Sequence, residues 1–479
     1  MDKKMFSGLK DMALQFREAG GTLLCVGGAV RDTLGILGEG ASTPKDIDLV
    51  LFGLDLDKAM EISRRMGNPR LVTRKVVLGG EPEGDIIHLR FPQALLEISV
   101  RRDPQGKAIP FSQDILRLDA LNRDFTLNSI YQDTLSGEIL DPLGGLVDLR
   151  YFRLRATGPK IFESDPLRLL RAFSLISRRG YHSDGALLEL VRKSVPLLDN
   201  VSKSRVWPEW RAWSASRYPH LGLRFLRESG LIEYFPELPP LILSPQNWQV
   251  HPEGSVWNHT LLVVQAMSEH LRLHGSPRKG LSLDPTLLTL SALTHDLGKV
   301  LENRLEDGIS GRGFYPQHAE KGVPLASRFL KSIRCPDRLR EGILKLTRYH
   351  MEGSFSSLTA PRLRALARYL HPQATLADLW ALKASDWNGR LYWPEPYPLS
   401  LDEFVEAVGG SLEPPEDLLS GSEVIDLFGL REGTYLGKML QLLRDSHDLG
   451  KISTKEDAIS LLRKTLKREN CLRKEGRVS

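Results

Sequence analysis

The chain has little cysteine and no long apolar run, and both absences narrow what it can be. Its 479 residues include three cysteines (Cys25, Cys335 and Cys471), which lie far apart and lack the spacing of a metal site. This argues against a disulfide framework and favours a reducing cytoplasm. No segment approaches the roughly 20 apolar residues of a membrane span, and the first five residues lack the apolar core of a signal peptide. We expect a cytoplasmic protein with no membrane partner.

An excess of charge of one sign is also lacking. The chain has 65 Lys and Arg against 60 Asp and Glu, a net charge of +5, which permits nucleic-acid binding without requiring it. A basic run covers residues 463–477, and such a run is either a solvated helix end or an RNA-phosphate contact. Nothing in the sequence predicts the oligomeric state.

The pattern of apolar residues changes along the chain and divides it into four parts. Residues up to about 155 mix strands and helices, with strands expected at 46–52, 95–100 and 139–140. From Pro166 onward, apolar residues recur every three or four positions, as in helices. Proline-rich stretches at 236–240 and 393–398 indicate two boundaries. We expect an α+β protein with a mixed-sheet head at 1–155, a helical neck and body at 156–240, an all-α domain at 241–395 and a helical tail at 396–479.

A glycine turn and a pair of aspartates in the head predict a nucleotide site. Gly27 and Gly28 follow an apolar stretch that reads as a buried strand, and they would let the backbone approach a triphosphate. Asp46 and Asp48 are two residues apart on the next predicted strand, so both side chains leave the same face. Two such carboxylates can hold Mg²⁺ ions between an attacking hydroxyl and an α-phosphate. Each signal is weak alone, but their order favours metal-assisted nucleotidyl transfer.

Further motifs follow in a fixed order. They are Asn122-Arg123-Asp124-Phe125-Thr126-Leu127-Asn128, then Asp141-Pro142-Leu143-Gly144-Gly145, then Asp165-Pro166-Leu167-Arg168-Leu169-Leu170-Arg171. With the glycine turn and the aspartates, this set resembles the class II tRNA nucleotidyltransferases (CCA-adding enzymes) and the related bacterial poly(A) polymerases. The resemblance implies an enzyme that adds C, C and A from CTP and ATP to the tRNA 3′ end without a template.

The resemblance also implies a role for each motif residue. Glu97 would be a third carboxylate at the metals, although an exposed charge on a half-buried strand explains it equally well. Asp165 and Arg168 are three apart, so on a helix they would share a face and read the incoming base; the alternative is a surface ion pair. The remaining nucleotide-binding residues are Gly27 and Gly28 in the turn, Arg31 and Arg171 at the triphosphate, Asp32 bracing the turn, Arg123 at the phosphates or ribose, Asp124 beside it, and Asn128 fixing the backbone.

The chain departs from the family pattern at three positions. It has Ser164 where the family usually has Glu, Asn122 where the family usually has Arg, and Ser174 where the family often has Arg. The segment at 102–118, where the family keeps a flexible loop needed for the switch from C to A, is short. Addition of CC alone, addition of A alone, and poly(A) synthesis therefore stay open as narrower alternatives.

Histidines and aspartates in the middle of the chain form a second pattern. His259, the pair His295-Asp296 and Asp386 resemble the four ligand positions of HD metal-dependent phosphohydrolases, and His318 and His350 fall where two-metal members carry further ligands. Imidazole with carboxylate suits Mn, Ni, Co, Fe or Zn. The resemblance implies hydrolysis of a phosphoester, such as a 2′,3′-cyclic or terminal phosphate on damaged RNA. His251 is expected to be structural.

Two readings from other classes stay open. In one, the chain is a metal phosphohydrolase whose N-terminal domain only binds RNA. In the other it is a non-enzymatic RNA-binding scaffold, against which the intact Asp46/Asp48 pair argues.

Overall fold

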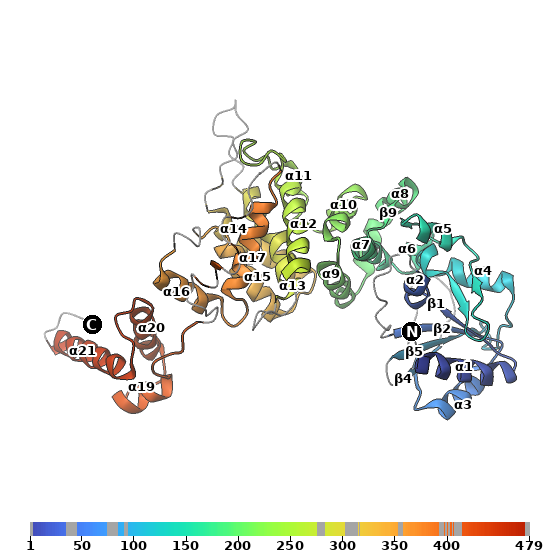
Figure 1. Ribbon diagram of the computed structural model, residues 1–479, viewed down its shortest axis with the longest axis horizontal. Coiled ribbons are helices and arrows are strands. Elements are labelled where there is room, and N and C mark those ends of the chain that lie inside the picture. The colour runs from blue at the N-terminus through green and yellow to red at the C-terminus, as the bar shows by residue number, and fades with distance from the viewer. Residues whose placement is uncertain are drawn as a thin grey trace. The chain divides into compact units, whose positions relative to one another are not determined.

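The computed structural model describes residues 3–34, 46–73, 85–90, 94–274, 283–301, 315, 317–352, 358–391, 397, 400, 403–404, 406 and 414–474. The chain forms two compact units, 1–236 and 237–479, and the boundary between them in the sequence falls in the proline-rich stretch at 236–240 (Figure 1). The finer division into four domains remains a prediction, and its boundary at 395–396 lies outside the described residues. The α+β class is confirmed.

The described part of the N-terminal unit contains one seven-stranded sheet in the order β3-β4-β5-β2-β1-β6-β7. Strands β2 and β5 are parallel, and the other neighbouring pairs are antiparallel. The three strands predicted from the sequence are confirmed as β2, β5 and β7. The bounds are β1 Thr22–Val26, β2 Asp46–Phe52, β3 Arg70–Thr73, β4 Asp85–Arg90, β5 Leu95–Val100, β6 Tyr131–Asp133 and β7 Ile139–Leu140.

Helices cover the two faces of this sheet unequally. On one face, Leu116 and Ala120 of α4 (Gln113–Leu121) pack on Val26, Val50 and Phe52. Helices α1 (Lys3–Glu18) and α3 (Leu56–Met66) contact each other and the sheet, and lie together along it in Figure 1. Side chains alternate along β2, so Asp46 and Asp48 project on the same face as Val50 and Phe52, which α4 covers further along the strand. Among the described residues, Asp46 and Asp48 at that end of the face are exposed, and we call it the open end of the sheet.

After the sheet, the N-terminal unit becomes helical around a long amphipathic helix. Helix α7 (Arg168–Arg179) buries Phe173, whose ring lies 4.9 Å from that of Trp210 and 5.6 Å from that of Trp213. Aromatic pairs at such separations contribute strongly to a core. The other elements are α2 Gly28–Leu34, α5 Gly145–Arg150, β8 Arg153–Leu154, α6 Ile161–Ser164, β9 His182–Ser183, α8 Gly185–Ser194, α9 Val206–Ser214 and α10 Pro219–Glu228, with 3₁₀ turns η1 Thr126–Asn128, η2 Val195–Asn200, η3 Lys203–Arg205 and η4 Leu231–Tyr234.

The named elements of the C-terminal unit are all helical. Helix α13 (Pro285–Thr294) is buried on every side from Thr286 to Thr294 and contacts α12, α15 and α17, as expected for a helix that is apolar all round. It lies in the core formed with these three helices. The helices are α11 Pro240–Leu243, α12 Val256–His274, α13, η5 Leu297–Leu301, α14 His318–Ser332, α15 Asp337–Tyr349, α16 Ala360–Leu370, α17 Leu376–Asn388, α19 Gly421–Phe428, α20 Thr434–Asp448 and α21 Lys455–Lys474.

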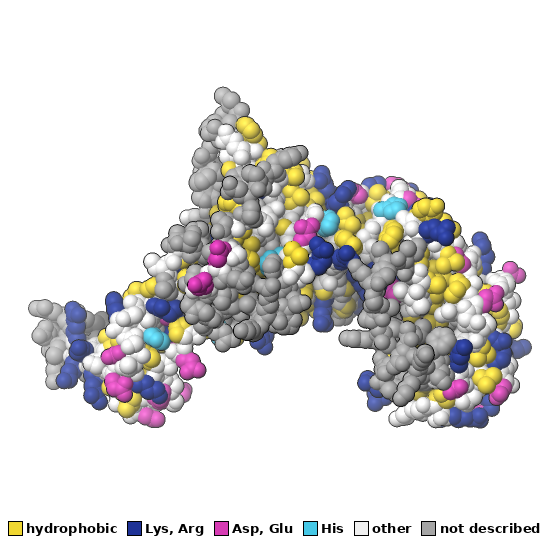
Figure 2. Space-filling model, in the orientation of Figure 1, with side chains coloured by type: hydrophobic (Ala, Val, Ile, Leu, Met, Phe, Trp, Pro, Cys, Tyr) yellow, Lys and Arg dark blue, Asp and Glu magenta, His cyan; other side chains and the backbone are white. Residues whose placement is uncertain are grey.

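The last three helices have a small core of their own. Val424, Met439, Leu443 and Leu462 are among its buried residues. Lys and Arg side chains line α21, seen in dark blue at the left of Figure 2. Among the described helices, none combines the length and apolar character that crossing a membrane requires.

Candidate catalytic and metal sites

Three carboxylates lie together on the open end of the sheet. Asp46 and Asp48 are exposed on β2 while Ile47 between them is buried, so both aspartates leave the same face, as predicted. Glu97 of β5 stands directly opposite Asp48 in the parallel ladder and shares that face. The Nε2 atom of His88 lies 3.6 Å from a Glu97 oxygen. We call Asp46, Asp48 and Glu97 the carboxylate face.

The glycine turn touches this face. Gly27 has a φ of +77°, and a Cβ added there would lie 2.8 Å from Oδ2 of Asp48. A side chain at position 27 would therefore strain the backbone and push into the carboxylate. Gly28 opens α2, and Val26 pairs with Asp48 across the strands, which fixes the turn at the carboxylates.

Polar contacts connect the turn to α7. Arg31 is buried and donates from Nε to Asp32 over 2.8 Å and from Nη1 to the Asn128 side-chain oxygen over 2.6 Å. The Asn128 amide donates to Asp124 over 3.0 Å, and the other oxygen of Asp32 lies 2.8 Å from a nitrogen of Arg179. Burial alone would raise the pKa of Asp32, but Arg31 and Arg179 outweigh it and lower that pKa. These predicted residues form one connected network.

Arg123 is held inside the head. Its Nε lies 3.2 Å from Asp119 and 3.1 Å from the hydroxyl of Tyr131, and that hydroxyl donates to Asp119 over 2.6 Å. Burial would lower the pKa of Arg123, but Tyr131 and Asp119, with a contribution from Asp48, raise it. The sequence analysis missed Asp119 and Tyr131, although Asp119 lies four residues before Arg123, a spacing that brings helical side chains together.

Asp165 and Arg168 do not share a helix face, so that prediction is wrong. Asp165 lies between α6 and α7 with an extended backbone (φ −149°, ψ 96°), because the following Pro166 disfavours helical geometry at residue 165. Its carboxylate lies 2.9 Å from Arg205. Arg168 is the first residue of α7 and donates to the Ser164 hydroxyl over 3.0 Å. The alternative, a surface ion pair between Asp165 and Arg168, is not observed either, because each residue contacts other partners.

Arg171 lies one turn further along α7 and connects the helix to its surroundings. Its Nη1 lies 3.3 Å from Asp124, and its Nε lies 3.7 Å from Glu209 of α9. Ser174 donates to the other Glu209 oxygen over 2.5 Å. The serine at this position, where the family often has arginine, thus contacts Glu209.

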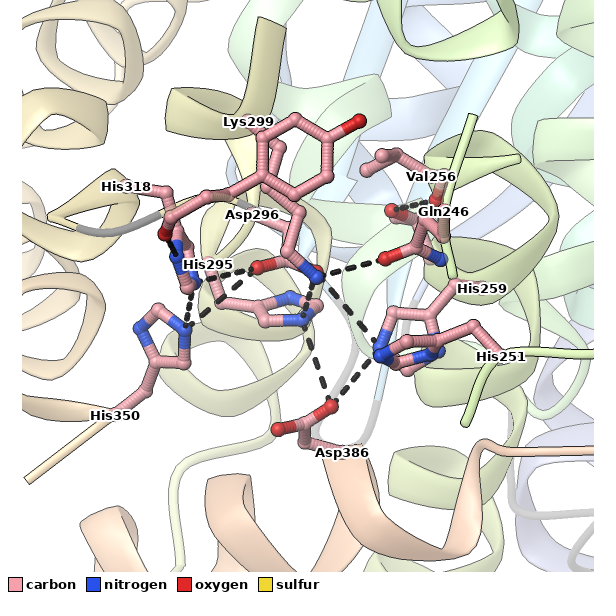
Figure 3. Close-up of polar contacts among 12 residues, drawn as sticks. Gln246, His251, Val256, His259, His295, Asp296, Lys299, His318, His350 and Asp386 are labelled. Atoms are coloured by element: carbon pink, nitrogen blue, oxygen red, sulfur yellow. Dashed lines mark hydrogen bonds and ion pairs between the residues drawn. The ribbon is translucent and has the colours of Figure 1, made fainter. Parts of the chain in front are cut away.

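The histidines and aspartates of the second pattern meet in the C-terminal unit (Figure 3). They come from five separate segments: α12, the residues just after α13, the first residue of α14, the residue just after α15, and the last turn of α17. The histidines and Asp296 are buried, and the Asp386 side chain is 16% exposed. We call this set the histidine centre: His259, His295, Asp296, His318, His350 and Asp386.

Asp296 lies in the middle of this centre and faces both halves. Its Oδ2 is 3.2 Å from Nε2 of His295 and 3.8 Å from Nε2 of His259. Its Oδ1 is 3.1 Å from Nε2 of His318 and 3.7 Å from Nε2 of His350. Two potential ligand groups therefore share one carboxylate: His259, His295 and Asp296, and Asp296, His318 and His350.

Asp386 completes the first half. Its Oδ1 is 2.9 Å from Nε2 of His259 and 3.9 Å from Nε2 of His295. The Nε2 atom of His295 is buried and has no hydrogen-bond partner of proper geometry in the described part of the chain. An inward-facing nitrogen of this kind, beside carboxylates and further imidazoles, fits a divalent transition metal. The residues present are therefore suited to hold metal.

Ionisation within the centre also suits metal binding. Burial lowers the pKa of His350 to about 4, so its ring is neutral near pH 7. Burial would raise the pKa of Asp296, but His295 and Lys299 outweigh it and keep that carboxyl well below its usual range. A neutral imidazole and an ionised carboxylate are the ligand forms that metals require.

Two glycines bring the segments of the centre together. A Cβ at Gly298 would overlap the backbone oxygen of His318 and lie 2.7 Å from the nitrogen of Gly322. The backbones of η5 and α14 therefore touch directly. This contact lets His318 approach Asp296, which lies two residues before Gly298.

Comparison with known families agrees with these two sites. The sequence matches the poly A polymerase head domain over residues 23–155, the probable RNA and SrmB-binding site of polymerase A over 180–241, and the HD domain over 256–386. The multifunctional CCA protein of Nitrosospira multiformis is 30% identical over 356 residues, which cover 67% of this chain and 80% of that protein. The present chain belongs to the multifunctional CCA protein family.

Other members of the CCA protein family and solved structures resemble it as well. The multifunctional CCA protein of Actinobacillus pleuropneumoniae is 33% identical over 305 residues, covering 60% of this chain and 69% of the relative. The Bacillus stearothermophilus CCA-adding enzyme in complex with CTP aligns with a TM-score of 0.62 at 19% identity, covering 98% of this chain and 100% of that one. The Thermotoga maritima CCA-adding enzyme complexed with tRNA-CCA gives 0.59 at 16% identity, with 97% and 96% covered. At these identities the structures establish a shared fold.

In this member of the CCA protein family, three residues around the histidine centre were not assigned a role from the sequence. Lys299 lies 2.6 Å from Oδ2 of Asp296 and donates to the side-chain oxygen of Gln246 over 2.7 Å. Glu253 lies 2.9 Å from a nitrogen of each of His251 and His259. Lys299 could have been suspected because it follows the His-Asp pair, whereas Gln246 stands far from any motif.

Proposed function

We propose that this protein is a template-independent tRNA 3′-end nucleotidyltransferase that adds C, C and A from CTP and ATP. The observation that carries the proposal is the carboxylate face, with Asp46, Asp48 and Glu97 beside a glycine turn in a chain of the CCA protein family. The tRNA 3′-hydroxyl attacks the α-phosphorus of the bound nucleotide, and pyrophosphate leaves. The proposed partners are thus the tRNA 3′ end, CTP and ATP, and the proposed location is the cytoplasm.

The chain supplies positioning and charge for this reaction. Asp46 and Asp48, with Glu97 next to them, would hold Mg²⁺, which neutralises charge on the entering and leaving oxygens when bound. The turn at Gly27 and Gly28 lets the backbone approach the triphosphate. Arg31 and Arg171 would balance the negative charge of the phosphates.

Base selection is proposed to depend on the start of α7. Arg168 is held by the hydroxyl of Ser164 and the backbone oxygen of Asn122, and Asp165 is held by Arg205. Donors and acceptors fixed in this way reject a base that leaves them unpaired. Two of the three departures from the family pattern, Ser164 and Asn122, contact Arg168. Because these contacts differ from the family pattern, addition of CC alone, addition of A alone and poly(A) synthesis stay open as alternatives.

An incorporation assay tests the proposal and separates its alternatives. Transcripts of a tRNA that end at the discriminator base, at C or at CC would be supplied with CTP or ATP singly and together. A CCA-adding enzyme extends all three to CCA and then stops. Extension limited to CC, extension of the CC transcript by A alone, or unlimited addition of A would identify a CC-adding enzyme, an A-adding enzyme or a poly(A) polymerase. No incorporation under any condition would favour the RNA-binding scaffold.

A second activity is proposed for the histidine centre, because two ligand groups share Asp296. The residues His259, His295, Asp296 and Asp386 would hold one transition metal (Ni, Mn, Co, Fe or Zn), and Asp296, His318 and His350 a second. Bound metal would supply Lewis acidity for hydrolysis of a phosphoester, such as a 2′,3′-cyclic or terminal RNA phosphate. Hydrolysis of such ends by the full chain, lost in His295→Ala, tests this activity. If the main activity of the chain proved to be phosphoester hydrolysis and Asp46→Ala left it unchanged, the chain would instead be a phosphohydrolase with an RNA-binding head.

A further inference from the structure

Three histidines of the centre are oriented in the same way. The Nδ1 atoms of His295, His318 and His350 contact the backbone oxygen three residues earlier, at 2.8, 2.7 and 2.7 Å. With the hydrogen on Nδ1, each ring presents Nε2 as a lone-pair donor toward Asp296. Each of these rings is thus fixed by its own backbone segment.

His259 is oriented differently. It lies inside α12, and its Nδ1 faces the carboxylate of Glu253 at 2.9 Å, an ion-pair distance without the geometry of a hydrogen bond among the described residues. Its Nε2 then lies 2.9 Å from Oδ1 of Asp386 and 3.8 Å from Oδ2 of Asp296. Among the four histidines of the centre, this one is paired with a charged group on the side away from the proposed metal.

Glu253 is itself firmly placed. Its side chain is 1% exposed, and the same oxygen that faces His259 lies 2.9 Å from Nδ1 of His251. The rings of His251 and His259 meet edge to face, 4.6 Å apart, and lie next to each other in Figure 3. The other Glu253 oxygen accepts from the backbone nitrogen of Leu391, just beyond the helix that carries Asp386. The carboxylate thus connects the start of α12 to the end of α17.

We propose that Glu253 is a positioning residue of the histidine centre, which fixes the ring of His259 so that Nε2 faces the metal, and that His251 holds Glu253 in place. The inference rests on the metal function proposed above. A carboxylate on the outer nitrogen of a ligand histidine selects the tautomer and makes the inner nitrogen a stronger donor. His251 therefore has a role in orienting the centre through Glu253.

The test measures metal affinity in the full chain, with Co²⁺ as the probe. Calorimetric titration gives the affinity and the number of ions bound, and visible absorption reports the ligand geometry. Glu253→Ala is expected to weaken one Co²⁺ site by about 10- to 100-fold and to alter its absorption bands. Glu253→Gln, which fills the same space and can still accept from Nδ1 of His259, should weaken it less. Glu341→Ala, on the exposed surface of α15, is the matched control and should bind like the wild type.

The outcomes are distinct. Unchanged affinity and spectrum in Glu253→Ala would overturn the inference and leave the metal function standing. A third Co²⁺ ion bound by the wild type and lost in Glu253→Ala would also overturn it, because His251, Glu253 and His259 would then be ligands of a separate site. Failure of the wild-type chain to bind any Co²⁺ would overturn the proposed metal function. If Glu253→Ala did not fold, the smaller loss expected of Glu253→Gln would still decide the matter.

Discussion

The two candidate sites of this chain provide for metal in opposite ways. On the carboxylate face, Asp46 and Asp48 are exposed at the open end of a sheet. In the histidine centre, five of the six side chains are buried, and four of them are imidazoles. A Mg²⁺ ion prefers oxygen ligands and keeps waters and substrate phosphates around it, so an open site with few ligands suits it. A transition metal is retained by a closed set of protein ligands.

The difference indicates when each site becomes complete. As proposed, the carboxylate face would need the triphosphate to supply the remaining oxygen ligands, so its metal ions would bind together with the substrate. The histidine centre already has two ligand groups around Asp296 within the protein. Burying ionised groups without a partner is costly, and the contact of Lys299 with Asp296 offsets part of that cost. Metal binding at the carboxylate face should therefore depend on bound nucleotide, whereas the histidine centre should bind metal without substrate.

Of the substitutions that distinguish the two sites, Asp48→Ala should have the largest effect on activity. It removes a proposed metal ligand from the face, so nucleotide addition should fall on the order of a thousandfold or more. Affinity for tRNA should stay nearly unchanged, because no RNA contact is removed. Incorporation and tRNA-binding assays measure the two quantities, with Asp57→Ala at the exposed start of α3 as control. Substantial residual incorporation would contradict the metal assignment.

Asp296→Asn should empty the histidine centre while leaving the head intact. Because both halves share this carboxylate, Co²⁺ affinity should fall by more than about a hundredfold at each site. Nucleotide addition should change little, since Asp296 lies in the other unit. Metal analysis of the purified variant and an incorporation assay measure both effects. Retention of one fully occupied metal would show that the halves do not depend on a common ligand.

Lowering the pH should affect metal binding at the histidine centre more than nucleotide addition at the carboxylate face. Burial would lower the pKa of His259 and His318, but Asp386 and Glu253 raise it for His259, and Asp296 raises it for His318. As the pH falls through these raised values, protonation competes with metal, and Co²⁺ affinity should drop by about tenfold for each pH unit. Titrations between about pH 8 and about pH 5 test this. The proposed ligands of the carboxylate face include no histidine, so a parallel fall in nucleotide addition and Co²⁺ binding would argue against the assignment.

Arg168→Ala should have the smallest effect and should change selectivity more than rate. Loss of its donors should narrow the preference for CTP and ATP over UTP by about tenfold, with triphosphate affinity little altered. Competition between labelled nucleotides on a transcript ending at the discriminator base measures this ratio. Unchanged selectivity would remove Arg168 from base recognition.

How far the sequence predicts this molecule depends on whether partners lie close along the chain. Strand β2 was predictable because Asp46 and Asp48 alternate with apolar residues at its start and a continuous apolar run completes its seven residues. Asp165 was misplaced because the spacing to Arg168 fits a helix, whereas Pro166 prevents one from including residue 165.

The outer contacts of the histidine centre were harder to predict. The roles of Glu253 and Gln246 depend on side chains brought together only by folding: Glu253 meets the end of α17, and Gln246 meets Lys299. Their residue types are common on surfaces, so the sequence carries no signal of burial there. The ligands themselves were recognisable because their order resembles a known family.

The direct backbone contact at Gly298 has a consequence for the way this centre can vary. A methyl group at that position would push η5 and α14 apart and increase the distance from Asp296 to His318. The ligands could all be kept and the second ion still be lost. The distance between Asp296 and His318 thus depends on Gly298, a residue that offers no ligand atom.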